Sequence, residues 1–285
     1  MDISKDKKFF YTISETVEAD SGEKYEIQDF LGAGGNGVVY EVIDCSGNEF
    51  AIKFNLNFTD VSKARFKQEV RVLRSIKHPH LLSCIDEGTV QGKAKNGHIE
   101  EIPFMIMEKA DSDLRKYLWT KGKISYSEYI SQFCGLSEAL AELNQRVVHR
   151  DIKLENILII GDRWVLSDLG LCSYLSEDEH EDLTGVHEKI GPKYWMSPEA
   201  INRMYDIKQE IIPASDVFQL SAVFWFVVNG KYPLGIVCED DWNNSDLLTC
   251  RLLIKCLSFN ANSRPENGEK LYGEFSLIRE YYETH

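Results

Sequence analysis

The segment from His149 to Asn156 places a carboxylate, a cation and an amide at a spacing that could support catalysis. It contains the pattern H-R-D-x-x-x-x-N, whose four fixed positions arise by chance at roughly one in 160,000 starts with equal residue usage. Asp151 could accept or orient the proton of an attacking hydroxyl. Lys153 could neutralise charge on a group in transfer, and Asn156 could offer its amide oxygen to a metal ion.

A second carboxylate, Asp168, follows the apolar run Val165-Leu166 and precedes Leu169-Gly170. Glycine at this point permits a sharp turn after the expected strand. A carboxylate so placed could bind Mg²⁺ that bridges the β- and γ-phosphates of a nucleotide. Asn156 and Asp168 are therefore the predicted metal ligands.

Residues 31–39 contain three glycines in the pattern G-x-G-x-x-G-x-V. Alone, this pattern is weak, because a flexible hairpin or a dinucleotide-binding turn could also produce it. A dinucleotide-binding turn requires a helix directly after the glycines, whereas β-branched Val38 and Val39 favour a strand. A glycine-rich hairpin can lay its backbone N–H groups over phosphates without a side-chain clash.

Lys53 lies in Ala51-Ile52-Lys53 on the expected next strand. An isolated strand lysine is usually solvated, but beneath a glycine loop its ammonium could hold the α- and β-phosphates. Glu69, in the following helix, could reach inward to pair with Lys53. We expect both residues to take part in catalysis.

The elements needed to position these residues change in character along the chain. The first third predicts strands over 25–31, 38–43, 50–54, 81–87 and 104–108, one helix over 63–76, and an exposed loop over 91–101. After Ala110, helical spacing dominates, with an amphipathic helix over 125–145. The apolar stretch 217–228 is too short to span a bilayer and predicts a buried helix.

From about Phe30 to Arg264 the chain resembles the eukaryotic-type protein kinase family. The resemblance implies an α+β, bilobal fold, with a small antiparallel β-sheet N-lobe carrying one helix and a larger, mainly helical C-lobe. It places the catalytic domain at 25–282, with the N-lobe over about 25–108 and the C-lobe over about 111–282. Residues 1–24 would be an N-terminal extension, either an extra strand or a loose tail.

The same resemblance implies ATP and Mg²⁺ as cofactors, with ATP in the cleft between the lobes and a protein as the phosphate acceptor. Asp151, Lys153, Lys53 and Glu69 are the implied catalytic residues. The implied nucleotide-binding residues are Leu31, Gly32, Ala33, Gly34, Gly35, Asn36, Gly37, Val39, Ala51, Lys53, Met107, Glu108, Ala110 and Leu158.

Several further residues match structural positions of the family. Ser197-Pro198-Glu199 is similar to the A-P-E motif, and Arg264 is similar to the ion-pair partner of its glutamate. Asp216, which opens the apolar helix, is similar to the buried carboxylate that holds the catalytic loop. Asp-Leu-Gly replaces Asp-Phe-Gly at residues 168–170, where Leu169 can still fill an apolar slot.

The acceptor residue is predicted by conflicting signals. Lys153 is typical of serine/threonine kinases, whereas Pro192 and Trp195 resemble the substrate loop of tyrosine kinases. We favour serine or threonine, with tyrosine or dual specificity as the alternative. A pseudokinase that acts as a nucleotide-binding scaffold and a small-molecule kinase remain further alternatives, although the Ser-Pro-Glu segment favours a peptide platform.

Counting back from Glu199, the position of the family's usual activating phosphothreonine falls on Glu188. A carboxylate there could pair permanently with Arg150 and supply one negative charge where a phosphate supplies nearly two. A solvated glutamate in an acidic loop is the competing interpretation. The first interpretation predicts activity without phosphorylation at this site.

The bulk composition excludes several kinds of partner. The net charge of −14 and the pI near 5.0 argue against nucleic acid and against anionic membrane surfaces. Seven cysteines, an odd number without a C-x-x-C pair, argue against a disulfide framework and a zinc cluster. They favour a reducing compartment, so we expect a cytoplasmic protein.

Overall fold

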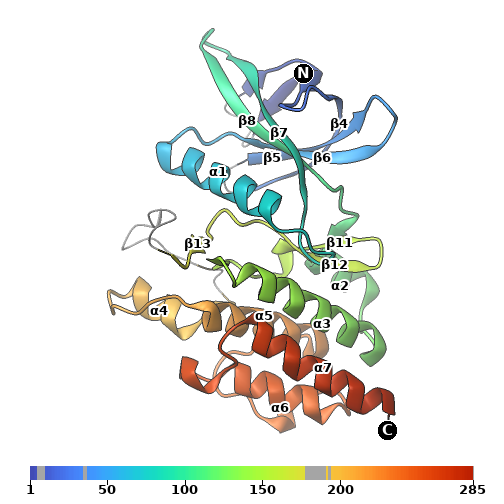
Figure 1. The fold of residues 1–285 in the computed structure, drawn as a ribbon, viewed down its shortest axis with the longest axis vertical. Helices are drawn as coiled ribbons and strands as arrows, with labels where there is room; N and C mark the ends of the chain where they lie inside the picture. The colour runs from blue at the N-terminus through green and yellow to red at the C-terminus, as the bar shows by residue number, and fades with distance from the viewer. Residues whose placement is uncertain (5–9, 35–36, 177–190, 192–193, 285) are drawn as a thin grey trace. The chain divides into compact units, whose positions relative to one another are not determined.

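The computed structural model describes residues 1–4, 10–34, 37–176, 191 and 194–284. The chain forms two compact units (Figure 1), in agreement with the predicted α+β, bilobal class. Unit 1 consists of residues 1–77 and 82–110, and unit 2 of residues 78–81 and 111–285. The boundary between them therefore lies at the Ala110–Asp111 peptide, apart from the short segment 78–81.

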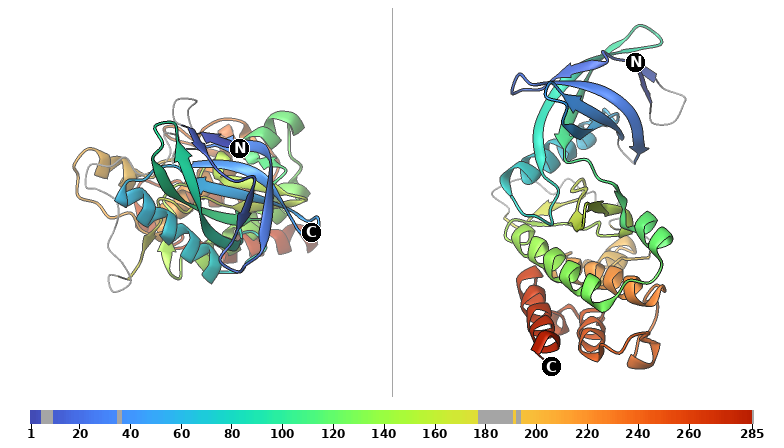
Figure 2. Two further views of the ribbon diagram at one scale, coloured as in Figure 1. Left: turned by 90° about the horizontal axis from the view of Figure 1, so that it is seen from above. Right: turned by 90° about the vertical axis from the view of Figure 1, so that its right-hand side faces the viewer.

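Unit 1 is an antiparallel sheet with a helix on one face (Figures 1 and 2). The strand order is β1-β2-β7-β8-β6-β5-β4-β3. The strands are β1 (Asp2–Ser4), β2 (Phe10–Thr12), β3 (Thr16–Glu18), β4 (Lys24–Ala33), β5 (Gly37–Asp44), β6 (Glu49–Asn55), β7 (Cys84–Ala94) and β8 (Ile99–Met107), and the helix is α1 (Asp60–Ser75). Thr59 caps α1, because its side chain accepts a hydrogen bond from the Ser62 N–H.

The first strands of the chain belong to the core of unit 1. Side chains alternate between the two faces of a strand, so Ile52 and Phe54 point away from the face that carries Lys53. Ile3 and Val17 are buried in one cluster with these two residues. The described part of residues 1–24 therefore forms strands that pack into this core. This is the predicted extra strand and not the predicted loose tail.

The expected exposed loop over 91–101 is wrong, because β7 and β8 run through it as a hairpin. The register pairs Gln91 with Glu101 and Lys93 with Ile99. Gly92 contributed to the loop prediction, but here it lies within a strand and is closely packed. A Cβ on Gly92 would lie 2.4 Å from the Cδ1 of Ile102 on the neighbouring strand.

Unit 2 is mainly helical, with short strands beside its longest helices. The helices are α2 (Leu114–Lys121), α3 (Tyr126–Leu143), α4 (Pro198–Met204), α5 (Pro213–Asn229), α6 (Leu247–Cys256) and α7 (Gly268–Thr284), with 3₁₀ turns η1 (Leu154–Asn156), η2 (Glu239–Asp241) and η3 (Ala261–Ser263). The strands are β9 (Ser112–Asp113), β10 (Val147–Val148), β11 (Ile157–Ile160), β12 (Arg163–Leu166) and β13 (Ser173–Tyr174).

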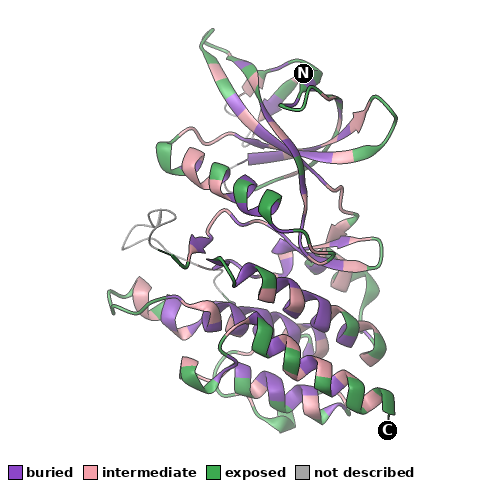
Figure 3. Cartoon of the chain, viewed as in Figure 1, coloured by how far each residue is buried: buried purple, intermediate pink, exposed green. Residues whose placement is uncertain are grey.

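Helix α5 lies in the core of unit 2 and is buried along most of its length (Figure 3), which confirms the predicted buried helix. The rings of Phe133 on α3 and Phe224 on α5 stack with centroids 3.8 Å apart, and Phe275 on α7 packs edge-on against both. Among the residues that the structure describes, no helix combines the length and apolarity needed to cross a bilayer.

Candidate active site

The glycine-bearing hairpin joins β4 to β5 in unit 1. Its turn is closed by a hydrogen bond from the Gly34 N–H to the Gly37 carbonyl at 2.9 Å. A Cβ on Gly37 would lie 2.0 Å from the Phe54 carbonyl oxygen, so sheet packing demands glycine there. Cβ atoms on Gly32 and Gly34 would meet no described atom within 4 Å. Packing among the described residues therefore does not explain these two glycines, whereas a ligand approaching the backbone would.

Of the other residues in the predicted phosphate loop, the structure describes only some. Gly35 and Asn36 lie outside the described residues. Leu31 and Ala33 end β4, and Leu31 is 40% exposed. The loop is therefore open to a ligand at the part that the structure describes.

Lys53 and Glu69 form the predicted ion pair within unit 1. The Lys53 Nζ donates to both carboxylate oxygens of Glu69 at 2.8 and 3.0 Å. Glu69 is 3% exposed and Lys53 is 18% exposed. Strand register places Lys53 directly opposite Val39 on β5. The pair thus holds the ammonium next to a residue of the glycine hairpin.

The predicted adenine-binding residues Met107, Glu108 and Ala110 lie at the end of β8 and directly after it. Met107 is buried and pairs in register with Ala51 of β6. Between Glu108 and Ala110, the Lys109 Nζ donates to Glu41 at 2.6 Å and to Glu49 at 2.8 Å. Sequence reasoning missed Lys109, because its partners lie some sixty residues earlier in the chain. Leu158, the remaining predicted residue, belongs to β11 in unit 2.

The candidate catalytic segment of unit 2, residues 149–156, brings Lys153 and Asn156 to the carboxylate of Asp151. The Oδ2 of Asp151 accepts hydrogen bonds from the Lys153 Nζ at 2.7 Å and from the Asn156 Nδ2 at 2.9 Å. The same Nδ2 also donates to the Asp151 carbonyl oxygen at 2.8 Å. Because both amide hydrogens point to Asp151, the amide oxygen of Asn156 points away from it. An oxygen so directed is a suitable ligand for a hard cation.

The environment of Asp151 is consistent with its predicted role as a proton acceptor. Burial raises the pKa of this carboxyl; the positive charge and hydrogen bond of Lys153 oppose the rise, and the negative charge of Asp168 adds to it. The net shift is upward. Asp151 is thus a stronger base than an exposed aspartate and stays ionised only above its raised pKa.

The residue before Asp168, Ser167, links this part of the chain to Asn156 by two hydrogen bonds. The N–H and the Oγ of Ser167 both donate to the Asn156 carbonyl, at 2.9 and 3.0 Å. Asp168 itself has a φ of 59°, a left-handed conformation that aspartate tolerates better than most residues. The two predicted metal ligands therefore come from adjacent, mutually anchored segments, and their oxygen-rich character fits Mg²⁺.

Asp216 holds the catalytic segment from α5, as the resemblance implied. Its Oδ2 accepts from the His149 N–H at 2.8 Å and its Oδ1 from the Arg150 N–H at 2.9 Å. The Asn144 Nδ2 also donates to it at 3.1 Å. Burial raises the pKa of Asp216 despite these hydrogen bonds.

Glu199 and Arg264 form the second predicted ion pair, buried in unit 2 with exposures of 1% and 0%. Two N–H groups of Arg264 donate to the two Glu199 oxygens at 3.0 and 2.9 Å. Burial opposes ionisation of Glu199, but its hydrogen bonds and the charge of Arg264 outweigh burial, so its pKa is lowered. Ser197 caps α4 by accepting from the Ala200 N–H.

Of the three residues that the sequence singled out between 188 and 195, the structure describes only one. Glu188 and Pro192 lie outside the described residues. Trp195, however, is only 2% exposed and packs against Phe226 and Tyr232. It contributes to the core of unit 2 and does not lie on an exposed substrate platform, contrary to expectation.

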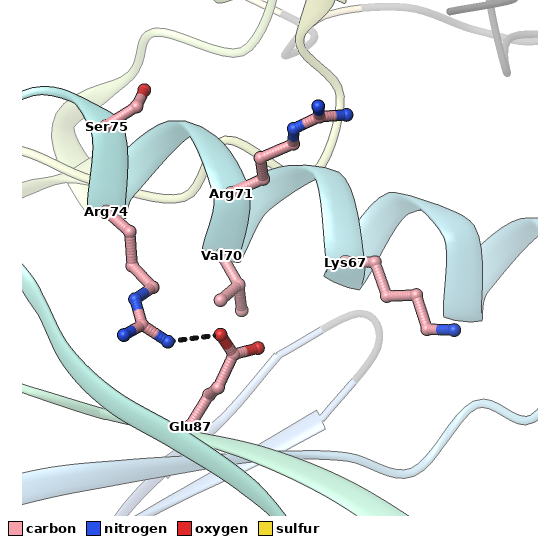
Figure 4. A pocket seen from close by; sticks show the side chains of 6 residues that line it. All are labelled: Lys67, Val70, Arg71, Arg74, Ser75 and Glu87. Atoms are coloured by element: carbon pink, nitrogen blue, oxygen red, sulfur yellow. Dashed lines mark hydrogen bonds and ion pairs between the residues drawn. The ribbon is translucent and has the colours of Figure 1, made fainter. Parts of the chain in front are cut away.

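A separate cavity of about 360 Å³ lies beside α1 in unit 1 (Figure 4). Its lining residues are Lys67, Val70, Arg71, Arg74, Ser75 and Glu87. The side chain of Arg74 points toward Glu87 and forms an ion pair with it, whereas the side chain of Arg71 points away from Glu87. None of the predicted nucleotide-binding residues lines this cavity.

Comparison with known proteins agrees with this geometry. The family described as "Protein kinase domain" matches residues 25–274. The chain belongs to the protein kinase domain family. It is 25% identical over 221 residues to the probable serine/threonine-protein kinase PknB of Bifidobacterium longum, a match that covers 75% of this chain and 31% of that protein.

Two further relatives of this kinase domain come from eukaryotes. The serine/threonine-protein kinase pak-1 of Caenorhabditis elegans is 30% identical over 214 residues, which cover 74% of this chain and 34% of that protein. The cell division control protein 2 homolog 3 of Trypanosoma brucei brucei is 29% identical over 218 residues, which cover 74% of this chain and 65% of that protein. The chain thus spans only part of the length of these relatives.

Proposed function

We propose that this chain is an active serine/threonine protein kinase that transfers the γ-phosphate of Mg²⁺-bound ATP to a protein hydroxyl. The observation that carries the proposal is the cluster in which Lys153 and Asn156 both hydrogen-bond to the buried Asp151 carboxylate. A scaffold without catalytic function would have no need to hold a basic carboxylate, a neutralising ammonium and a metal-binding amide together.

In this reaction, bound Mg²⁺ would neutralise charge on the β- and γ-phosphates. Asn156 and Asp168 are the residues proposed to hold it. Asp151 orients the acceptor hydroxyl and takes up its proton, and Lys153 stabilises negative charge on the transferring group. The glycine hairpin and the Lys53–Glu69 pair are proposed to bind the phosphates. Leu31, Val39, Ala51, Leu158 and the segment 107–110 are proposed to bind adenine.

Serine or threonine is the proposed acceptor for three reasons. Lys153 lies 2.7 Å from the catalytic carboxylate and so participates directly in the chemistry. Trp195, one of the two residues that favoured tyrosine, is buried and cannot contact a substrate directly. The names of the bacterial and nematode relatives, both serine/threonine-protein kinases, support the same choice.

We further propose that residues 25–282 form the catalytic domain and that residues 1–24 are an extension packed onto its sheet. A cytoplasmic location is also proposed. All seven cysteines are free, and five of them are buried. Burial raises the pKa of Cys84 to about 12 and that of Cys134 to about 11, so these thiols are unreactive structural groups.

Incubation of the purified chain with radiolabelled ATP and a mixed serine, threonine and tyrosine peptide library tests the function. With Mg²⁺ we expect phosphoserine and phosphothreonine, and with excess EDTA we expect no incorporation. Nucleotide binding without any transfer would show a scaffold and would overturn the catalytic proposal. Phosphotyrosine as the sole product would overturn only the proposed acceptor.

Replacement of Lys153 tests the electrostatic part of the mechanism. We expect Lys153→Met to lower kcat by about 10- to 100-fold, because a charge that stabilises the transition state is removed. Loss of the ammonium also raises the pKa of Asp151 further. Because kcat falls as pH drops through that pKa, the acidic limb of the kcat profile should move to higher pH. An unmoved limb, measured between pH 5 and 9, would contradict the assignment of Asp151 as the base.

A further inference from the structure

Gln219 lies on α5 one turn after Asp216, so the two side chains share one face of the helix. Gln219 is 1% exposed. Its Oε1 accepts from the Ile152 N–H at 2.9 Å, and its Nε2 donates to the Arg150 carbonyl at 3.2 Å. Both ends of the amide are therefore bound to the backbone on either side of Asp151.

Together, Asp216 and Gln219 bind four successive peptide groups of the catalytic segment. Asp216 accepts from the N–H groups of residues 149 and 150. Gln219 binds the carbonyl of residue 150 and the N–H of residue 152. Asp151 lies between the two peptides that Gln219 holds, so the position of its carboxylate depends on this amide.

The backbone at this point needs such support. Arg150 has a φ of 70°, a left-handed conformation that is unfavourable for a long side chain. A buried peptide group without a partner is also costly. An amide fits both peptides because it can donate and accept at once without adding charge.

The amide of Gln219 also lies close to Gly191. A Cβ on Gly191 would lie 3.1 Å from the Gln219 Nε2 and 3.4 Å from the Arg150 carbonyl oxygen. Gly191 has a φ of 98° and no side chain, so its backbone can lie close to the Gln219 amide and the Arg150 carbonyl. One side chain thus lies close to both the catalytic segment and Gly191.

We propose that Gln219 is a positioning residue for catalysis, which acts by fixing the backbone on both sides of Asp151. The proposal rests on the proposed kinase function. It predicts that Gln219 governs kcat and leaves ATP binding nearly unchanged, because its hydrogen bonds are to the backbone on either side of Asp151.

The central test compares Gln219→Met with the wild type. Methionine preserves length and burial but removes both hydrogen bonds. We expect kcat to fall by about 10- to 100-fold, since small displacements of a catalytic group have effects of this size. KM for ATP should stay within about threefold. Amide hydrogen exchange at Ile152 should become faster.

Gln219→Glu is the conservative variant. In this buried place next to Asp216, the new carboxyl should take up a proton and could then donate to the Arg150 carbonyl while accepting from Ile152. It should therefore restore most of the activity lost in Gln219→Met. A glutamate variant no more active than the methionine variant would overturn the proposal.

Asn229→Ala is the matched control. Asn229 is a buried amide on the same helix that accepts from the Asn243 N–H at 2.9 Å and donates to the Trp225 carbonyl at 3.1 Å. Its loss should lower the melting temperature about as much as Gln219→Met but leave kcat unchanged.

Equal loss of kcat in the two variants, or full kcat in Gln219→Met, would show that Gln219 is only structural. Inactive wild-type protein would instead refute the kinase function. Exchange at the Ile152 amide would still report whether Gln219 holds the segment.

Discussion

Asp151→Asn is expected to lower kcat by about 10²- to 10⁴-fold, the range typical for loss of a general base. Asparagine keeps the size of the side chain and a carbonyl oxygen that can accept from the Lys153 Nζ and the Asn156 Nδ2. It cannot take up the proton of the acceptor hydroxyl. The segment should therefore keep its shape while the chemical step fails.

Two measurements separate loss of chemistry from loss of structure in Asp151→Asn. The dissociation constant for Mg-ATP and the melting temperature should both remain close to those of the wild type, because the variant removes a buried charge rather than a packed group. Asp162→Asn is the matched control, since Asp162 lies exposed between β11 and β12. Wild-type turnover in Asp151→Asn would refute the mechanism.

Arg264→Leu is expected to lower the free energy of unfolding by about 3–5 kcal/mol, because it leaves the buried charge of Glu199 without a partner. Arg264 also donates to the carbonyls of Ser258, Phe259 and Ala214 at 2.7, 2.9 and 3.1 Å. All five N–H groups of its guanidinium are thus used. Lysine cannot reproduce this geometry, so Arg264→Lys should also be strongly destabilising.

Urea unfolding followed by tryptophan fluorescence would measure this loss. The double variant Glu199→Leu/Arg264→Leu should recover part of it, because no unpaired charge then remains buried. The control is Lys255→Met, which breaks the exposed Lys255–Glu274 pair at 2.9 Å and should cost no more than about 1 kcal/mol. A loss in Arg264→Leu as small as in the control would show that the buried pair does not stabilise unit 2.

The local sequence was sufficient for residues whose partners are close in the chain or whose motif has a fixed spacing. The spacing in H-R-D-x-x-x-x-N places Asp151, Lys153 and Asn156 in one short segment, where Lys153 and Asn156 both bond to Asp151. The glycine hairpin was predictable because Val38 and Val39 favour a strand. The buried helix α5 was predictable from the mostly apolar stretch 217–228.

Other features depend on the tertiary structure, because their partners are distant in sequence. Gly92 suggested a loop, but its neighbour Ile102 belongs to the opposite strand of the hairpin. Trp195 suggested a surface platform, but Phe226 and Tyr232 cover it.

Gln219 belongs to no motif that the sequence analysis used. Its proposed role follows only from the hydrogen bonds of 2.9 and 3.2 Å between its side chain and the catalytic segment. Local spacing thus determined which groups could do the chemistry. Only tertiary packing decided which groups hold them in place, because burial and hydrogen-bond partners come from segments that meet only in the folded chain.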